Sequence, residues 1–267
     1  MNNPYYRRAG SDGEFQVFDS TEATGSNWNP EIQHGSPPLA LLSKLIEEGA
    51  EGSGLRVGRL TLDILGAIPV SRVWVRSWVD RPGARISLRV AEMAAQAPNG
   101  SRRPVARVTA WLLARSDTTD VVTDRHPPLV ESEAAGAPLP QSWTGAPGYL
   151  RTVSFRRQDD GGGTATVAWM RPLVPLVDAE STTALQRLAM VVDSANGVGA
   201  ALDPARFVFM NTDTTVHLHR LPEGDDFAVR ARASIGPDGV GVTTAEIYDR
   251  RGFIGTSAQT LLVQRRP

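Results

Sequence analysis

The sequence predicts an α+β protein made of two similar units, each a helix wrapped by an antiparallel β-sheet. Two stretches with helical spacing of apolar residues are each followed by several stretches in which apolar and polar residues alternate. The order of strand, helix and four strands occurs twice, which indicates an internal duplication about 140 residues long. Between the two copies lies a segment rich in Pro, Ala, Gly and Asp.

The first unit begins with an expected strand at Glu14–Asp19, followed by a helix. Ser36 is expected to cap this helix, Pro37 suits its first position, and Gly49 can end it in a left-handed conformation. Turn residues separate the strands that come next. These expected strands are Leu55–Ile68, Val70–Asp80, Ala84–Gln96 and Pro104–Arg115.

The second unit repeats this order around a helix expected over Thr182–Val198. Its closing strand, FIGTSAQTLL from Phe253, aligns with PVARVTAWLL from Pro104 in the first unit. Residues 1–115 and 149–267 are therefore expected to form the two units, with 116–148 as a linker outside both cores. The expected strands of the second unit are Tyr149–Arg157, Thr164–Arg171, Arg206–Leu221, Phe227–Ile235, Val240–Asp249 and Phe253–Gln264.

Composition and charge exclude several classes of protein. The chain has 267 residues, of which 41% are hydrophobic and 21% are charged, as in ordinary globular proteins. The formal net charge of −1 provides no basic field for nucleic acid. There is no cysteine to act as a nucleophile, and no apolar run reaches the roughly 20 residues of a membrane span. No apolar region follows Arg7 and Arg8, so a cytoplasmic protein without a membrane partner is expected.

Asp193 lies at the edge of an apolar stripe on the second predicted helix. The stripe consists of Leu185, Leu188, Ala189, Val192 and Ala195. A carboxylate in this position costs free energy unless a polar group binds it, although a solvated or capping aspartate is the ordinary interpretation. Asn211, Thr212 and Gln259 lie on the strands that follow and could face this helix. An acid surrounded by amides and hydroxyls indicates a hydrolytic site without a nucleophilic side chain.

Four blocks carry a resemblance to a known family. They are WNPEIQHGSPPLALL from Trp28, VVDSANGVG from Val191, FMNTDTTVHLHRLPEG from Phe209 and GFIGTSAQTLLV from Gly252. In this order, and over almost the whole chain apart from the linker, the sequence resembles double-hotdog acyl-CoA thioesterases of the thioesterase II type, in the thioesterase-like superfamily. The resemblance implies an α+β tandem (double) hotdog whose two sheets join edge to edge, an acyl-CoA substrate, and neither cofactor nor metal.

The resemblance also implies a water held by an acid, a hydroxyl and a glutamine. The acid matches Asp193 and the glutamine matches Gln259. The hydroxyl position falls on Asn211, with Thr212 beside it, although threonine is the usual residue there. This departure keeps open a second function, that of a non-catalytic protein that binds acyl-CoA or an acyl lipid.

A thioester is reactive enough for attack by a water that a general base activates. The oxyanion that then develops needs N–H donors, and the start of the first helix, at Gly35 and Ser36, can supply them. His34 could add a hydrogen bond, so these three residues are the expected substrate-binding residues. Gly35 as a simple turn glycine and His34 as a packing residue remain the alternative interpretations.

Other features of the sequence concern metal binding, the number of active sites and the assembly. His217 and His219 are two residues apart, with Asp213 nearby, but no further His or Cys accompanies them, so a metal site is not expected. Ala110 aligns with Gln259, so the equivalent site of the first unit is expected to be silent. The duplication supplies two hotdog units within one chain, and a homodimer of chains is the expected assembly.

Overall fold

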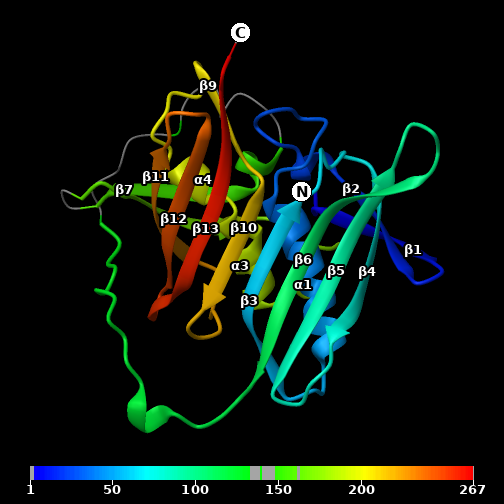
Figure 1. Ribbon diagram of the computed structural model, residues 1–267, viewed down its shortest axis with the longest axis horizontal. Coiled ribbons are helices and arrows are strands. Elements are labelled where there is room, and N and C mark those ends of the chain that lie inside the picture. The colour runs from blue at the N-terminus through cyan, green and yellow to red at the C-terminus, as the bar shows by residue number, and fades with distance from the viewer. Residues whose placement is uncertain (1–2, 133–138, 140–147, 161–162, 267) are drawn as a thin grey trace.

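The computed structural model describes residues 3–132, 139, 148–160 and 163–266. In it, one sheet curves around the helices of both halves of the chain (Figure 1). The first half lies on the right of that view and the second half, in yellow to red, on the left. The strands of the described residues are β1 (Tyr6–Asp12), β2 (Phe15–Ser20), β3 (Leu55–Ile64), β4 (Arg72–Arg81), β5 (Ile86–Gln96), β6 (Arg102–Ala114), β7 (Val153–Asp159), β8 (Thr166–Pro172), β9 (Phe207–Asn211), β10 (Asp213–Leu218), β11 (Phe227–Ile235), β12 (Val240–Asp249) and β13 (Gly252–Arg265).

The two half-sheets join edge to edge at β3 and β10. The strand order is β1-β2-β4-β5-β6-β3-β10-β13-β12-β11-β8-β7, with β9 also paired to β13. β3 and β10 are antiparallel, and Thr61 lies opposite Thr215. This pairing confirms the expected edge-to-edge join, and it leaves neither strand with an open edge at the centre of the molecule.

The helices pack against the concave side of this sheet and against each other. α1 (Ser36–Ala50) contacts β3 to β6 as well as α3 (Ala184–Val192). The short helix α4 (Ala195–Val198) contacts β11. Every residue of α1 from Ser36 to Ile46 is buried, so its leucines contribute to one core shared by both halves. Full burial stabilises the fold by roughly 1.5–3 kcal/mol for each such side chain.

Both predicted ends of α1 are wrong, and one strand of the first half was not predicted. Gly35, not Ser36, is the N-cap residue, and Gly49 lies inside α1, which ends at Ala50. A Cβ atom at this position would meet the guanidinium of Arg89, the flexible end of a long side chain. The prediction also missed β1, because this edge strand is exposed along most of its length and has no apolar alternation.

The second half departs from prediction at its helix and its first strand. The helix expected over Thr182–Val198 is broken at Asp193, which ends α3 just before α4 begins. Thr183 caps α3 in a capping box with Gln186. Residues Tyr149–Arg151, predicted to begin a strand, form a 3-10 turn before β7.

The strand predicted over Arg206–Leu221 is interrupted by a β-bulge. Asn211 of β9 lies opposite Leu261, and Thr215 of β10 lies opposite Ala258. β9 and β10 therefore contain one residue more than the facing stretch of β13, and the extra residue falls at Thr212–Asp213. A bulge of this kind changes which side chains face the core.

Residues 116–132 of the expected linker run along the outside of the molecule (Figure 1), whereas Leu139 packs on a buried cluster that contains Phe209. Leu129 packs on an outer cluster that contains Trp169, and Glu131 forms ion pairs of 2.7 Å with both Arg156 and Arg250. Residues 133–138 and 140–147 lie outside the described residues. The division into 1–115, 116–148 and 149–267 stays a prediction. In the described ranges, no helix has the length and apolar character needed to cross a bilayer.

Candidate active site

A cavity of about 300 Å³ lies where the start of α1 meets the end of α3. Its lining is mostly apolar, and its polar residues include His34, Asp193, Asn196, Asn211 and Arg157. The apolar lining includes Trp28, Ile64, Ile68, Leu150, Phe155, Val198 and Phe209. A mostly apolar cavity with a small number of polar groups is the usual form of a small-molecule site.

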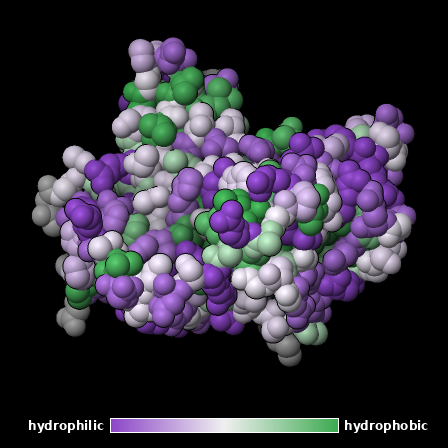
Figure 2. All heavy atoms as spheres, turned by 60° about the horizontal axis from the view of Figure 1, so that its bottom comes forward, coloured by the Kyte–Doolittle hydropathy of each residue, from purple (hydrophilic) through white to green (hydrophobic). Residues whose placement is uncertain are grey.

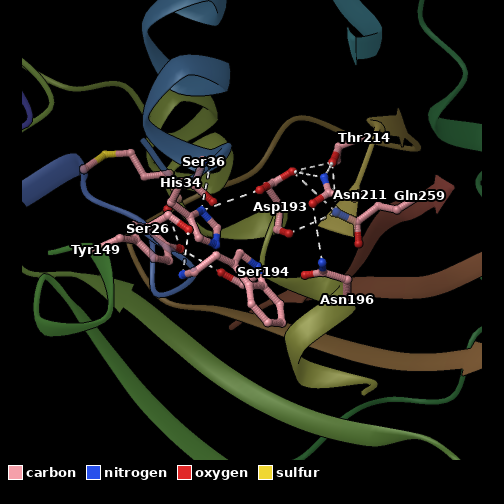
Figure 3. Close-up of polar contacts among 12 residues, drawn as sticks. Ser26, His34, Ser36, Tyr149, Asp193, Ser194, Asn196, Asn211, Thr214 and Gln259 are labelled. Carbon is pink, nitrogen blue, oxygen red and sulfur yellow. Dashed lines mark hydrogen bonds and ion pairs between the residues drawn. The ribbon is translucent and has the colours of Figure 1, made fainter. Parts of the chain in front are cut away.

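Asp193 is 1% exposed, and its carboxylate is held mainly through one oxygen. Oδ1 accepts hydrogen bonds from Nδ2 of Asn211 at 2.8 Å and from the hydroxyl of Thr214 at 2.5 Å (Figure 3). Nε2 of Gln259 lies 3.4 Å from the same oxygen. These donors compensate for burial of the charge and leave the second oxygen, Oδ2, facing the start of α1.

Gln259 supports this arrangement from β13. Its Nε2 donates to the backbone carbonyl of Asp193 and to the hydroxyl of Thr214, each at 2.9 Å. Its Oε1 is buried and has no hydrogen-bond partner among the described residues. A buried acceptor without a donor is costly, so this atom is suited to accept a hydrogen bond from a bound molecule.

The β-bulge explains how Asn211 and Thr214 reach the same carboxylate oxygen. In a regular strand, residues three apart point to opposite faces of the sheet. The extra residue at Thr212–Asp213 reverses this alternation, so both side chains face Asp193. Asn196 on α4 approaches from the other side, where its Nδ2 donates to Oδ1 of Asn211 at 3.4 Å. That contact favours the amide orientation in which Asn211 donates to the carboxylate.

On the side of Oδ2, the start of α1 approaches Asp193 closely. A Cβ atom on Gly35 would lie 2.5 Å from Oδ2, a distance that no real side chain allows. The positive end of the α1 dipole faces the carboxylate and stabilises its charge. The close approach of Asp193 leaves no room for a side chain at this position. Gly35 is therefore not a simple turn glycine.

His34 lies beside the same oxygen, with Nδ1 3.5 Å from Oδ2 of Asp193. The backbone N–H of Ser36 donates to this Nδ1 at 3.1 Å, so the proton of the neutral ring is on Nε2. Burial lowers the pKa of His34, although the nearby charge of Asp193 acts in the opposite direction. The imidazole is therefore neutral near pH 7 and can donate from Nε2.

Tyr149 holds the imidazole ring in place. The two rings stack with their centroids 3.9 Å apart and 12° between their planes. The Tyr149 hydroxyl donates to the carbonyl of Met190 at 2.9 Å and lies 2.8 Å from the hydroxyl of Ser194. Burial raises the pKa of Tyr149, so the phenol stays protonated. This residue ties His34 to the end of α3, next to Asp193.

The structure brings together all the predicted site residues except Thr212. The Thr212 hydroxyl donates to Asp213 and to the carbonyl of Thr260, away from Asp193, although Thr212 borders the cavity. The residue that sequence reasoning missed is Thr214, whose signal was only a run of polar residues that breaks strand alternation. The start of α1 also offers fewer N–H donors than expected: the Ser36 N–H binds His34, and Pro37 and Pro38 have none.

The two histidines considered for a metal site lie elsewhere. His217 is exposed on β10, and the ring of His219 lies against that of Phe253. Within the part of the chain that the structure describes, no group of three or more His, Cys, Asp or Glu side chains is arranged to hold a metal ion.

Comparison with known structures defines the class of fold. The chain is similar to a conserved protein of unknown function with a hotdog fold from Alicyclobacillus acidocaldarius, with 17% identity, a TM-score of 0.71, and coverage of 96% of this chain and 95% of that one. It is also similar to the acyl-CoA thioesterase II TesB2 from Mycobacterium marinum, with 12% identity, a TM-score of 0.65, and coverage of 98% and 95%. The fold is a double hotdog, as expected.

Family models then identify the family. The model of the acyl-CoA thioesterase N-terminal domain matches residues 24–113, and that of the C-terminal domain matches residues 124–263. The second match alone covers more than half of the chain, so the chain belongs to the acyl-CoA thioesterase family. Among curated proteins, no sequence matches it.

Proposed function

We propose that this thioesterase hydrolyses acyl-CoA by direct attack of a water that Asp193 activates. The arrangement of the Asp193 carboxylate is the observation that supports this most strongly. Asn211, Thr214 and Gln259 surround Oδ1, while Oδ2 faces His34 and Gly35 beside an apolar cavity. One oxygen thus orients the carboxylate, and the other is left to take a proton.

In this mechanism, Oδ2 of Asp193 accepts a proton from the water as its oxygen bonds to the thioester carbon. The carbonyl π bond breaks, and the negative charge moves to the carbonyl oxygen. The Gly35 N–H, the α1 dipole and Nε2–H of His34 stabilise that charge. When the C–O double bond re-forms, the C–S bond breaks, and the proton held by Asp193 passes to the CoA sulfur. The products are a free acid and CoA, and no covalent intermediate with the protein forms.

The cavity supports an acyl group as the part of the substrate that is bound beyond the reacting carbon. Its lining by Trp28, Phe155 and Phe209 offers apolar surface, and Arg157 also lines it. Burying an aliphatic chain against such a lining contributes roughly 0.8 kcal/mol for each CH₂ group.

The alternative function, acyl-CoA or acyl-lipid binding without catalysis, was based on Asn211 in place of threonine. In the structure, Asn211 donates to Asp193, and the hydroxyl comes from Thr214 instead. Because the set of donors is complete, we favour hydrolysis. A role in fatty acid metabolism, a cytoplasmic location and a homodimeric assembly remain predictions.

Replacement of Asp193 by Asn tests this function. The amide keeps the shape of the side chain but removes the base, so thiol release from a panel of acyl-CoA esters should fall by roughly 10²–10⁴-fold in kcat. KM and the melting temperature should change little, because other groups bind the substrate. Asp225→Asn, at an exposed position, is the matched control. Unchanged turnover in a well-folded Asp193→Asn variant would refute Asp193 as the base.

A further inference from the structure

A second cavity, of about 760 Å³, lies at the other end of the helix pair. It is bordered by the last turn of α1, the first turn of α3, and parts of β3 and β6. The active-site cavity lies between the start of α1 and the end of α3, so the two cavities occupy equivalent places in the duplicated fold.

The register of the sheet makes this equivalence specific. Thr61 and Thr215 lie opposite each other at the centre, and their next neighbours are Thr109 of β6 and Ala258 of β13. Thr61 therefore corresponds to Thr215, and Thr109 corresponds to Ala258. By the same correspondence, Leu60 takes the place of Thr214, and Ala110 takes the place of Gln259. Both replacements are buried and apolar, so the second cavity has neither of these two donors.

Part of the lining of the second cavity is apolar. The side chains that form it come from both halves of the chain and are Leu55, Val57, Leu112, Leu185 and Leu221. Figure 2 turns this end of the molecule toward the viewer, and green, apolar side chains lie in the middle of it between purple, hydrophilic ones. This surface can accommodate an aliphatic chain.

Most charged groups around the cavity already have partners. Lys44 forms ion pairs with Glu48 at 2.9 Å and with Glu180 at 2.8 Å. The carboxylate of Glu47 accepts hydrogen bonds of 2.8 Å from the hydroxyl of Thr183 and from Nε2 of Gln186. These contacts tie the end of α1 to the start of α3 and engage Glu47 and Glu48, while Glu51, the third carboxylate of the lining, is exposed to solvent.

Arg56 is different. Its Nη2 donates to the carbonyl of His219 at 3.2 Å, whereas its Nη1 is buried and has no acceptor among the described residues. Arg56 as a whole is half-buried and lines the cavity, so an anion bound there can form a charge-assisted hydrogen bond with the accessible part of its guanidinium. Arg115 lines the same cavity, so two guanidinium groups lie in its lining, and neither is used by the ion pairs of Lys44.

We propose that this second cavity binds an amphiphilic anion without hydrolysing it. The aliphatic chain of the ligand would lie on the leucines named above, and its carboxylate or sulfate head would bind Arg56 and Arg115. Binding is independent of the proposed hydrolysis, since it uses no residue near Asp193.

Methyl NMR spectra of the leucine-labelled full chain, titrated with decanoate, test the proposal. The methyl signals of Leu112, Leu185 and Leu221 should shift and saturate. Decyl sulfate should cause the same shifts, whereas decyltrimethylammonium, which has an equal chain and the opposite charge, should bind roughly 10- to 100-fold more weakly. Signals of Leu150 and Leu262, which border the active-site cavity, report separately on binding there.

Arg56→Gln should weaken decanoate binding at the second cavity by roughly 10-fold or more, and Arg125→Gln, at an exposed position outside the cavity, should not change it. The proposal is wrong if only the Leu150 and Leu262 signals shift, or if the cationic ligand binds the second cavity as tightly as decanoate. The ligand comparison uses the unaltered protein, so it decides the matter even if Arg56→Gln does not fold. Thiol release by the unaltered protein tests the proposed hydrolysis separately.

Discussion

The hydroxyl of Thr214 lies 2.5 Å from Oδ1 of Asp193, on the same carboxylate oxygen that Asn211 binds from three residues earlier in the chain. This contact exists because of the bulge between β9 and β10, and it supplies the hydroxyl that the sequence lacks at position 211. Thr214 also accepts a hydrogen bond from Gln259, so it links the strand side chains into one network.

We therefore predict that Thr214→Val lowers kcat by roughly 10- to 100-fold, with little change in KM. Valine keeps the shape of threonine but removes the donor to Asp193 and leaves Nε2 of Gln259 without this acceptor. Thr212→Val is the matched control, since the Thr212 hydroxyl points away from Asp193, and it should stay within a few-fold of wild type. Equal losses in the two variants would contradict the assignment.

Gly35→Ala should reduce kcat/KM by about tenfold or more, because the new Cβ would overlap with Oδ2 of Asp193 and displace the carboxylate. The backbone at Gly35 has φ of −67°, which alanine adopts without strain, so the effect reports on the contact alone. Gly58→Ala is the control, because its Cβ would meet mainly the flexible end of Leu113 and the residue does not line the active-site cavity. Full activity of Gly35→Ala, measured by thiol release, would show that this close approach is dispensable.

One competent active site in the chain is expected, and paired substitutions test it. Gln259→Ala should lower kcat by at least about tenfold, since two hydrogen bonds around Asp193 are lost. Ala110→Ser, at the equivalent position of the first half, should leave kcat unchanged, because the buried Leu60 and Ala110 stand there in place of Thr214 and Gln259 and supply no donor to a carboxylate. A comparable loss of activity from both changes would indicate that both halves take part in hydrolysis.

The stability of the protein should depend on pH through His34. Burial lowers the pKa of His34 in the folded state, so below the ordinary value of about 6.5 the unfolded chain binds a proton that the folded chain does not. The free energy of unfolding should therefore fall as the pH drops from 6.5 toward the pKa of the folded state. Below that pKa the effect should level off.

Urea unfolding at several pH values measures this effect. His34→Gln should show a smaller loss of stability on acidification than wild type, because the group that titrates is gone. His217→Gln, at an exposed position on β10, should keep the wild-type dependence. If the free energy of unfolding falls equally steeply below pH 6.5 in wild type and in His34→Gln, a group other than His34 is responsible.

Much of the fold and part of the site could be predicted from local pattern. Alternation identified most strands, because one face of each is buried in the core and side chains repeat every two residues. Asp193 stood out as a charge at the edge of an apolar stripe, and it is indeed buried. The broken helix at Asp193 and the polar edge strand β1 were missed, since neither disturbs the apolar pattern that was used to find elements.

The sequence by itself determined the duplicated order of helix and strands, through periodicity, and the family resemblance implied the double hotdog. Residue type and position pointed to Asp193, Asn211, Thr212 and Gln259 as candidates. Only the tertiary structure decided that Thr214 faces Asp193, since a bulge is defined by pairing with β13 and not by the strand alone. It also decided why residue 35 is glycine and where the proton of His34 lies. Both depend on contacts between α1 and the end of α3, two segments far apart in the chain that the shared core brings together.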